Sequence, residues 1–169
     1  LAGIRGDAEI APLPEEEIYR LFGLAPTDSL SRTLLKRSLA GTAARGLEPG
    51  CKFDACPILR GRQGNGKTET LRALASDAWA NGIGDYGSGA QLALSGWAVM
   101  AKANHSWLFE LGEVERLTQG RCQSAFKDWL TERVAKYQEK FEKVVRDHPR
   151  RFVTWGTTNE QELLNDETG

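Results

Sequence analysis

The sequence predicts an α/β fold: a parallel sheet flanked by helices, with a small helical segment in front of it. Three short apolar runs, at residues 55–59, 107–111 and 151–155, are separated by stretches of helical periodicity, and this alternation favours a parallel sheet. Residues 61–68 follow the first run and read Gly-Arg-Gln-Gly-Asn-Gly-Lys-Thr, which matches the phosphate-binding P-loop pattern. We therefore expect the sheet of a P-loop NTPase, with polar residues meeting at its carboxyl edge.

Residues 1–48 are predicted to form an arm and two helices that pack on the sheet. Pro14, followed by three glutamates, begins a first helix of about two turns. Thr27 or Ser29 is expected to cap the second helix, which ends near Gly46. Its charged residues are expected to form a solvated face, with contact to nucleic acid or to a neighbouring subunit as the alternative. They are Arg32, Lys36, Arg37 and Arg45.

The P-loop NTPase core is assigned to residues 49–169 and is expected to be truncated at its C-terminal end. In its P-loop, glycines permit positive φ and let backbone N–H groups curl around an anion. Lys67 can then reach the β- and γ-phosphates, and the Thr68 hydroxyl can join a Mg²⁺ shell at the start of a helix over residues 67–80. A fortuitous glycine-rich turn is the alternative. The predicted ATP-binding residues are Gly61, Arg62, Gln63, Gly64, Asn65, Gly66, Lys67 and Thr68.

The second and third strands add polar groups at the same edge. After a loop over residues 81–89 and a helix over 90–103, the apolar run 107–111 places Glu110 at the end of a strand next to the P-loop strand. Glu110 is predicted to hold Mg²⁺ or its water, as a Walker B acid does, and Glu113 to be a supporting acid or the base. An ordinary strand-end carboxylate is the alternative. The third strand runs into Asn159, so Lys67, Glu110 and Asn159 are expected to converge.

Residues 123–145 predict one long helix, because apolar residues recur along it at intervals of three and four. Its other side carries Lys127, Lys136 and Lys140 among acidic residues. Two interpretations stay open: a solvated helix with i,i+4 ion pairs, or a basic surface that faces DNA.

Composition excludes few classes of function. The 169 residues carry a net charge of −1, and the three cysteines lack metal-ligand spacing, so we expect reduced thiols. A zinc site built from Cys51, Cys56, Cys122 and a histidine is the alternative. No apolar run approaches the roughly 20 residues of a membrane span, which predicts a soluble cytoplasmic protein with no membrane partner.

Taken in order, several segments resemble the virulence-associated protein E family of phage and mobile-element ATPases, which is related to superfamily 3 helicases and phage primase-helicases. They are Pro49-Gly50-Cys51-Lys52-x-Asp54, the P-loop, Trp107-x-x-Glu110-Leu111-Gly112-Glu113, Gly156-Thr157-Thr158-Asn159 and Leu164-x-Asp166-x-Thr168-Gly169. The resemblance implies an AAA-like, helicase-type ATPase core. It also implies a homo-oligomeric ring, here expected to be a hexamer, which acts on single-stranded DNA and is joined to a primase module.

The resemblance also implies residue roles. Asn159 corresponds to the sensor that hydrogen-bonds the γ-phosphate or the lytic water, and Lys127 to a basic residue after the Walker B segment. Gln138 stands where members carry an arginine, and the Asn-Arg-Arg-Phe stretch usual after the final Thr-Gly is not in the chain. We therefore expect this fragment to bind nucleotide and to hydrolyse it poorly alone. The predicted catalytic residues are Lys67, Glu110, Glu113 and Asn159, with Thr68 and Glu110 as the Mg²⁺ ligands.

The function predicted from these features is an ATP-dependent, helicase-like motor in the replication of a phage or mobile element, in the cytoplasm of a bacterial host. A nucleotide-gated switch or scaffold in a defence or virulence system is the first alternative. A small P-loop phosphotransferase, with a second substrate held at residues 156–159, is the other.

Overall fold

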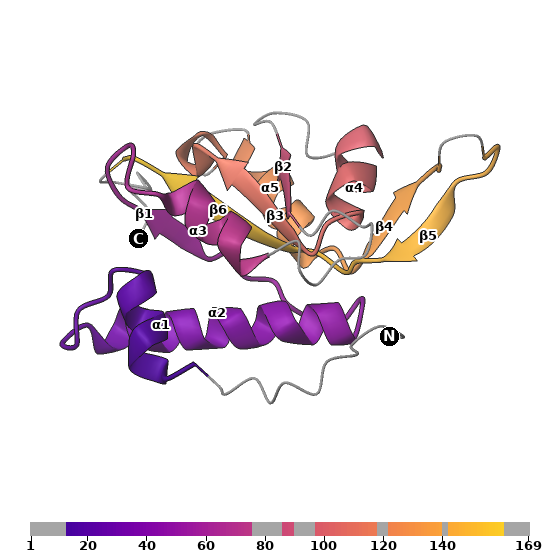
Figure 1. Ribbon diagram of the computed structural model, residues 1–169. Helices are drawn as coiled ribbons and strands as arrows, with labels where there is room; N and C mark the ends of the chain where they lie inside the picture. The colour runs from indigo at the N-terminus through magenta and orange to yellow at the C-terminus, as the bar shows by residue number, and fades with distance from the viewer. Residues whose placement is uncertain (1–12, 76–85, 90–96, 118–121, 140–141, 161–169) are drawn as a thin grey trace.

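The computed structural model describes residues 13–75, 86–89, 97–117, 122–139 and 142–160, which form an α/β fold (Figure 1). The elements in chain order are α1 (Glu15–Leu21), α2 (Ser29–Leu47), β1 (Ile58–Arg60), α3 (Lys67–Leu74), β2 (Tyr86–Gly89), α4 (Trp97–Asn104), β3 (Leu108–Gly112), the 3₁₀ helix η2 (Val114–Arg116), α5 (Cys122–Thr131), β4 (Val134–Tyr137), β5 (Arg146–Pro149) and β6 (Val153–Thr158). No helix in these ranges is long and apolar enough to cross a membrane.

The four strands of the main sheet are parallel and lie in the order β1-β6-β3-β2. The predicted parallel sheet is therefore confirmed. One detail was wrong: β6 lies between the P-loop strand β1 and the strand β3 that carries Glu110, so these two strands are not neighbours. Because all three strands run in the same direction, their carboxyl ends still meet at one edge.

Each face of the sheet has its own hydrophobic core. On β3, Phe109 and Leu111 point to a core shared with α4, α5 and the β4–β5 hairpin, whereas Leu108 points to a core shared with α1, α2 and α3. This alternation follows from the two-residue period of a strand. It puts Glu110 on the same face as Leu108, which is the α3 face.

The N-terminal helices are attached to the sheet by tryptophan side chains. Trp107 donates from Nε1 to the backbone oxygen of Thr42 at 2.9 Å, and Trp155 donates to the Thr42 hydroxyl at 3.2 Å. In Figure 1, α1 and α2 form a layer along this side of the sheet. The division at residues 48 and 49 stays a prediction.

The predicted solvated face of α2 was wrong for Arg45. Its side chain is buried and donates to the backbone oxygen of Phe53 at 3.2 Å, whereas Lys36 and Arg37 are exposed. Arg32 pairs with Glu16 and lies over the Tyr19 ring at 4.3 Å. The N-cap of α2 is Asp28, neither Thr27 nor Ser29, and its carboxylate accepts from the backbone N–H of Ser31 at 3.0 Å.

The predicted helix over residues 123–145 was wrong beyond Thr131. α5 ends there, and the chain continues into the antiparallel pair β4–β5. Long-range contacts decide this change, because buried Tyr137 accepts from Asn104 Nδ2 at 3.3 Å and stacks on His148 at 3.9 Å. Side-chain burial along β4 alternates with the period of a strand.

Two further strands differ from the prediction. Residues 86–89, expected in a loop, form β2 and pair in parallel with β3. The third predicted strand begins and ends later, at Val153–Thr158. The predicted helices 67–80 and 90–103 correspond to α3 and α4, and the structure describes only a part of each predicted range. Residues 76–80 and 90–96 lie outside the described residues.

Arg150 fastens the segment between β5 and β6 to the end of α5. Its guanidinium is buried over the Trp129 and Phe152 rings, at 4.7 and 4.9 Å from their centroids. It donates to the backbone oxygen of Trp129 and to the Glu132 carboxylate. Burial lowers the pKa of Arg150 to about 10, so the group keeps its charge at neutral pH. A charged anchor therefore fixes the short segment that links β5 to β6.

Candidate nucleotide-binding site

The P-loop joins the end of β1 to the start of α3, as predicted. Gly64 and Gly66 adopt left-handed conformations, with φ of 82° and 74°, and Gly66 is the N-cap of α3. A Cβ at either position would meet nothing within 4 Å, so glycine is favoured there by backbone conformation and not by lack of space. Gly61 lacks a positive φ. Of the three glycines, Gly64 and Gly66 therefore use the positive φ that the sequence permits, and Gly61 does not.

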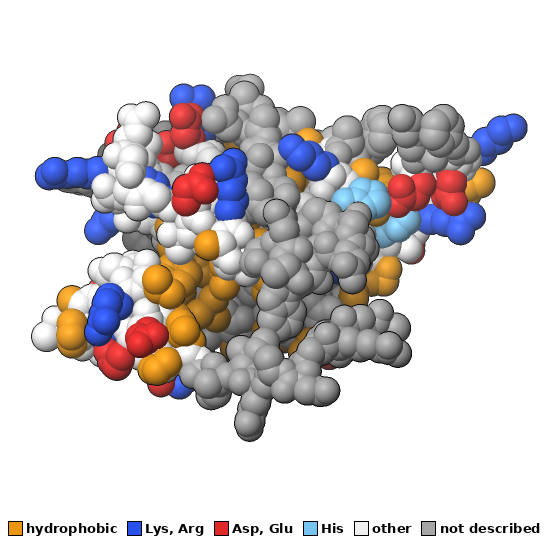
Figure 2. Space-filling model, viewed as in Figure 1, with side chains coloured by type: hydrophobic (Ala, Val, Ile, Leu, Met, Phe, Trp, Pro, Cys, Tyr) orange, Lys and Arg blue, Asp and Glu red, His pale blue; other side chains and the backbone are white. Residues whose placement is uncertain are grey.

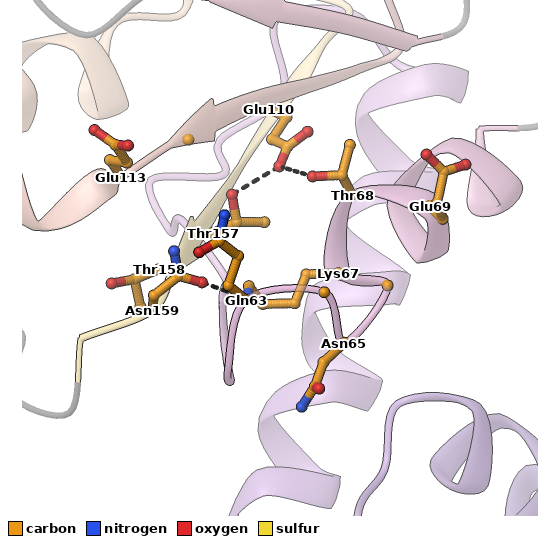
Figure 3. Close-up of a pocket in the computed structure, with 13 residues that line it drawn as sticks. Gln63, Asn65, Lys67, Thr68, Glu69, Glu110, Glu113, Thr157, Thr158 and Asn159 are labelled. Atoms are coloured by element: carbon orange, nitrogen blue, oxygen red, sulfur yellow. Dashed lines mark hydrogen bonds between the residues drawn. The ribbon is translucent and has the colours of Figure 1, made fainter.

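A pocket of about 510 Å³ opens over the P-loop and gathers residues from three parts of the chain (Figure 3). The P-loop and α3, the end of β3, and the end of β6 each form part of its wall. Its lining residues are Gln63, Gly64, Asn65, Gly66, Lys67, Thr68, Glu69, Glu110, Gly112, Glu113, Thr157, Thr158 and Asn159. Gly61 and Arg62 are the predicted ligand residues outside this set.

Lys67 connects the P-loop to the end of β6. Its ammonium group donates to the backbone oxygens of Gly61 and Arg62, at 2.7 and 3.0 Å. It also donates to Oδ1 of Asn159 at 2.8 Å, an interaction that spans 92 residues of sequence. Lys67 and Asn159 therefore lie together, as the sequence predicts.

Glu110 lies inside β3, two residues before its end, and only 4% of it is exposed. Its Oε1 accepts a hydrogen bond from the Thr68 hydroxyl at 2.8 Å and a second from the Thr157 hydroxyl at 2.7 Å. Figure 3 shows both bonds meeting at one carboxylate oxygen. Lys67, Glu110 and Asn159 thus converge on one pocket.

Thr157 and Thr158 were missed as individual site residues. The sequence pattern singled out residues 156–159 as a polar strand end, but only Asn159 received a role. The two-residue period of a strand could have identified Thr157. Trp155 packs in the core on the α3 side, so Thr157, two residues later on β6, faces the same side. Glu69 carried no recognisable signal, and Gly112 was quoted only as part of the segment 107–113, without a role.

Glu113 also lines the pocket, but in a different setting from Glu110. It is the N-cap of η2 with φ 52°, the one non-glycine residue with positive φ in the described ranges. Such a conformation costs about 1–3 kcal/mol. Its carboxylate pairs with Arg116 at 3.0 Å, and both side chains are about half exposed.

The donor set fits a Mg²⁺-bound polyphosphate. Oxygen atoms of Thr68 and Glu110 lie side by side beneath the N-terminus of α3, where backbone N–H groups and Lys67 favour an anion. Mg²⁺ takes few protein ligands and completes its shell with water and phosphate oxygens. Among the described residues, no three His, Cys, Asp or Glu side chains gather into a metal site.

The alternative zinc site has no support in the described ranges, because Cys51, Cys56 and Cys122 are free thiols outside any such cluster. Burial raises the pKa of the Cys56 thiol to about 12, which keeps it protonated at neutral pH.

The three candidate DNA-binding lysines do not share one helix. Lys127 is exposed on α5, and Lys136 is exposed on β4, where it pairs with Asp147 at 3.8 Å. Lys140 lies outside the described residues. In Figure 1 the β4–β5 hairpin extends away from the sheet, and Figure 2 shows charged side chains of both signs along it, with histidines at its base.

The fold and the pocket define an α/β protein with a P-loop sequence at the carboxyl edge of a parallel sheet. The model of the virulence-associated protein E-like domain matches residues 15–169, so the chain belongs to this family. The family associates the chain with phages and mobile elements. No curated protein matches the sequence.

Proposed function

We propose that the chain is the core of an ATP-dependent, helicase-like motor with a P-loop NTPase, AAA-like fold, acting on DNA in the replication of a phage or mobile element in the bacterial cytoplasm. One observation carries the proposal: Lys67 and Thr68 at the start of α3, Glu110 near the end of β3 and Asn159 after β6 line one pocket of about 510 Å³. A triphosphate needs this combination of a cation, a helix N-terminus, a hydroxyl and an acid.

Each residue has a role set by its position. Lys67 exchanges its bonds to the Gly61 and Arg62 carbonyls for bonds to phosphate oxygens, so the loop changes its internal contacts when nucleotide binds. Asn159, released from Lys67, is then placed to bond the γ-phosphate or the attacking water. Mg²⁺, when bound, neutralises phosphate charge and orients the phosphates.

Glu110 and Glu113 are proposed to have different roles. Glu110 is buried and held by two hydroxyls, which suits an acid that keeps one orientation toward the metal and its water. Glu113 is half exposed at the rim, which suits a group that exchanges protons with solvent. The arginine that would complete the site is expected from a neighbouring subunit of a hexameric ring.

DNA contact is assigned to the projecting hairpin. It carries Lys136 on β4 and Arg146 on β5, both exposed, and a basic side chain on a projecting element can reach a phosphate backbone. Nearby Asp147 and Glu142 pair with these groups, which limits the attraction. We therefore expect one subunit to bind single-stranded DNA weakly and in a salt-sensitive way. Binding should strengthen when several subunits of the ring contact one strand. A primase module is proposed as a further partner.

The test is ATP hydrolysis by the full-length protein with and without single-stranded DNA, for wild type and Lys67→Ala. We expect DNA-stimulated hydrolysis that Lys67→Ala abolishes while the fold remains. Lys52→Ala is a matched control, because Lys52 is exposed, pairs with Asp54 and lies outside the pocket. Hydrolysis undiminished in Lys67→Ala would overturn the assignment.

The same protein distinguishes the alternatives. ATP-dependent ring assembly without DNA-stimulated hydrolysis or strand separation would favour the switch or scaffold. ADP release that depends on a phosphate acceptor would favour the phosphotransferase.

A further inference from the structure

Thr157 supplies one of the two hydroxyls that hold Glu110, and no role of its own has been given to it above. It lies on β6, only 6% of it is exposed, and its hydroxyl donates to Oε1 of Glu110 at 2.7 Å. In the sheet register Thr157 is opposite Gly112, two residues beyond Glu110 on β3. A Cβ on Gly112 would lie 3.9 Å from the Thr157 hydroxyl oxygen. That distance is an ordinary van der Waals contact, so the direction of the Thr157 hydroxyl is set by its bond to Glu110 and not by the absence of a side chain at Gly112.

The Thr157 and Thr68 hydroxyls approach the same oxygen from different elements, β6 and α3. A hydroxyl has one hydrogen to donate and two lone pairs. In donating its hydrogen to Glu110, Thr68 keeps its lone pairs for a cation. The bond from Thr157 connects the same carboxylate to β6, which lies between β1 and β3. The orientation of the carboxylate therefore does not depend on α3 and the P-loop alone.

The geometry points to Thr157 as a positioning residue for magnesium: it fixes the Glu110 carboxylate, and through it the Thr68 hydroxyl, in the orientation that receives Mg²⁺ with the nucleotide. This inference rests on the proposed function. Removing a partner that orients a metal-binding group typically lowers metal affinity or activity by 10–100-fold. A purely structural Thr157 would instead change stability and leave the response to magnesium unaltered.

The experiment compares Thr157→Val, which keeps the shape without the hydroxyl, with Thr157→Ser, which keeps the hydroxyl. Thr154→Val is the matched control, since Thr154 is a buried threonine on the opposite face of β6 that accepts from Trp129 Nε1 at 3.0 Å. Binding of a fluorescent ATP analogue to the full-length protein is measured in Mg²⁺ and in EDTA, next to kcat, KM and thermal unfolding.

We expect Mg²⁺ to tighten nucleotide binding by wild type and by Thr157→Ser to similar degrees. In Thr157→Val the gain from Mg²⁺ falls by about 10-fold, and kcat falls by about 10–100-fold with little change in EDTA affinity. Thr154→Val loses stability but keeps the wild-type gain. A wild-type response to Mg²⁺ in folded Thr157→Val would overturn the inference while the proposed function stands. Wild type that binds no nucleotide would overturn both.

Discussion

Replacing Glu110 separates its chemical role from its structural one. In Glu110→Ala the Thr68 and Thr157 hydroxyls both lose their acceptor. Thr68 is partly exposed and can turn to water, whereas Thr157 is buried. An unsatisfied buried hydroxyl costs about 1–3 kcal/mol, so we expect a loss near 2 kcal/mol. For a domain of this length each kcal/mol shifts Tm by about 2–4 °C, which gives a fall of about 4–8 °C.

Glu110→Gln keeps an oxygen that can accept both hydrogen bonds, so its Tm should fall by less than about 3 °C. The charge is lost in both variants. One preorganised electrostatic contact is typically worth 10²–10³ in kcat, and we expect that loss from either change, with nucleotide affinity in EDTA retained by Glu110→Gln.

The assays are calorimetric unfolding, equilibrium nucleotide binding and DNA-stimulated ATP hydrolysis. Hydrolysis at the wild-type rate by Glu110→Gln would refute the metal role of Glu110. Equal Tm values for the alanine and glutamine variants would refute the argument from the buried Thr157 hydroxyl.

Three other substitutions test the loop, the hairpin and the helix layer. Gly66→Ala should destabilise the protein by about 1–2 kcal/mol and weaken nucleotide binding. Gly61 has no positive φ, so the free energy of unfolding of Gly61→Ala should lie within about 0.5 kcal/mol of wild type. Similar losses in the two variants would contradict the backbone argument. Lys136→Ala should reduce the salt dependence of single-stranded DNA binding by about 0.7 in log–log slope without changing nucleotide affinity, and an unchanged slope would exclude a phosphate contact. Gly41→Ala places a Cβ 1.9 Å from the Phe53 ring and should cost about 1–3 kcal/mol in urea unfolding, less in a Phe53→Leu background; equal costs in both would refute the clash.

The sequence predicted the parts of the fold that depend on local pattern. The P-loop was recognisable because its glycines and Lys67 serve one short turn between β1 and α3. The strands around Glu110 and Asn159 were found because buried parallel strands are continuous apolar runs. Period two along β6 could also have placed Thr157 on the Glu110 side, once the strand ends were known.

Other features depend on contacts between distant residues. The hairpin was read as a helix because the stacking of Tyr137 on His148 joins positions that no local period connects. β2 consists of Tyr86, Gly87, Ser88 and Gly89 and has little strand propensity, so backbone pairing with β3 decides its state. Arg45 has the sequence context of a solvated helix face, and only the packing of α2 against Phe53 buries it.

The order of the strands links the proposed DNA contact to the proposed ATP site. In the sequence, the hairpin lies between β3, which carries Glu110, and β6, which leads to Asn159. In the sheet, β3 and β6 are neighbours. The Arg150 anchor lies directly between β5 and β6, and β6 is hydrogen-bonded to β1 on one side and β3 on the other. A movement of the hairpin would therefore reach Thr157 and Asn159 through the ten residues that run from the buried, charged Arg150 to Asn159. If DNA binds the hairpin, its effect on hydrolysis should depend on Arg150, and Arg150→Met should reduce DNA stimulation more than basal hydrolysis. Equal reductions would show that the anchor supports the fold alone.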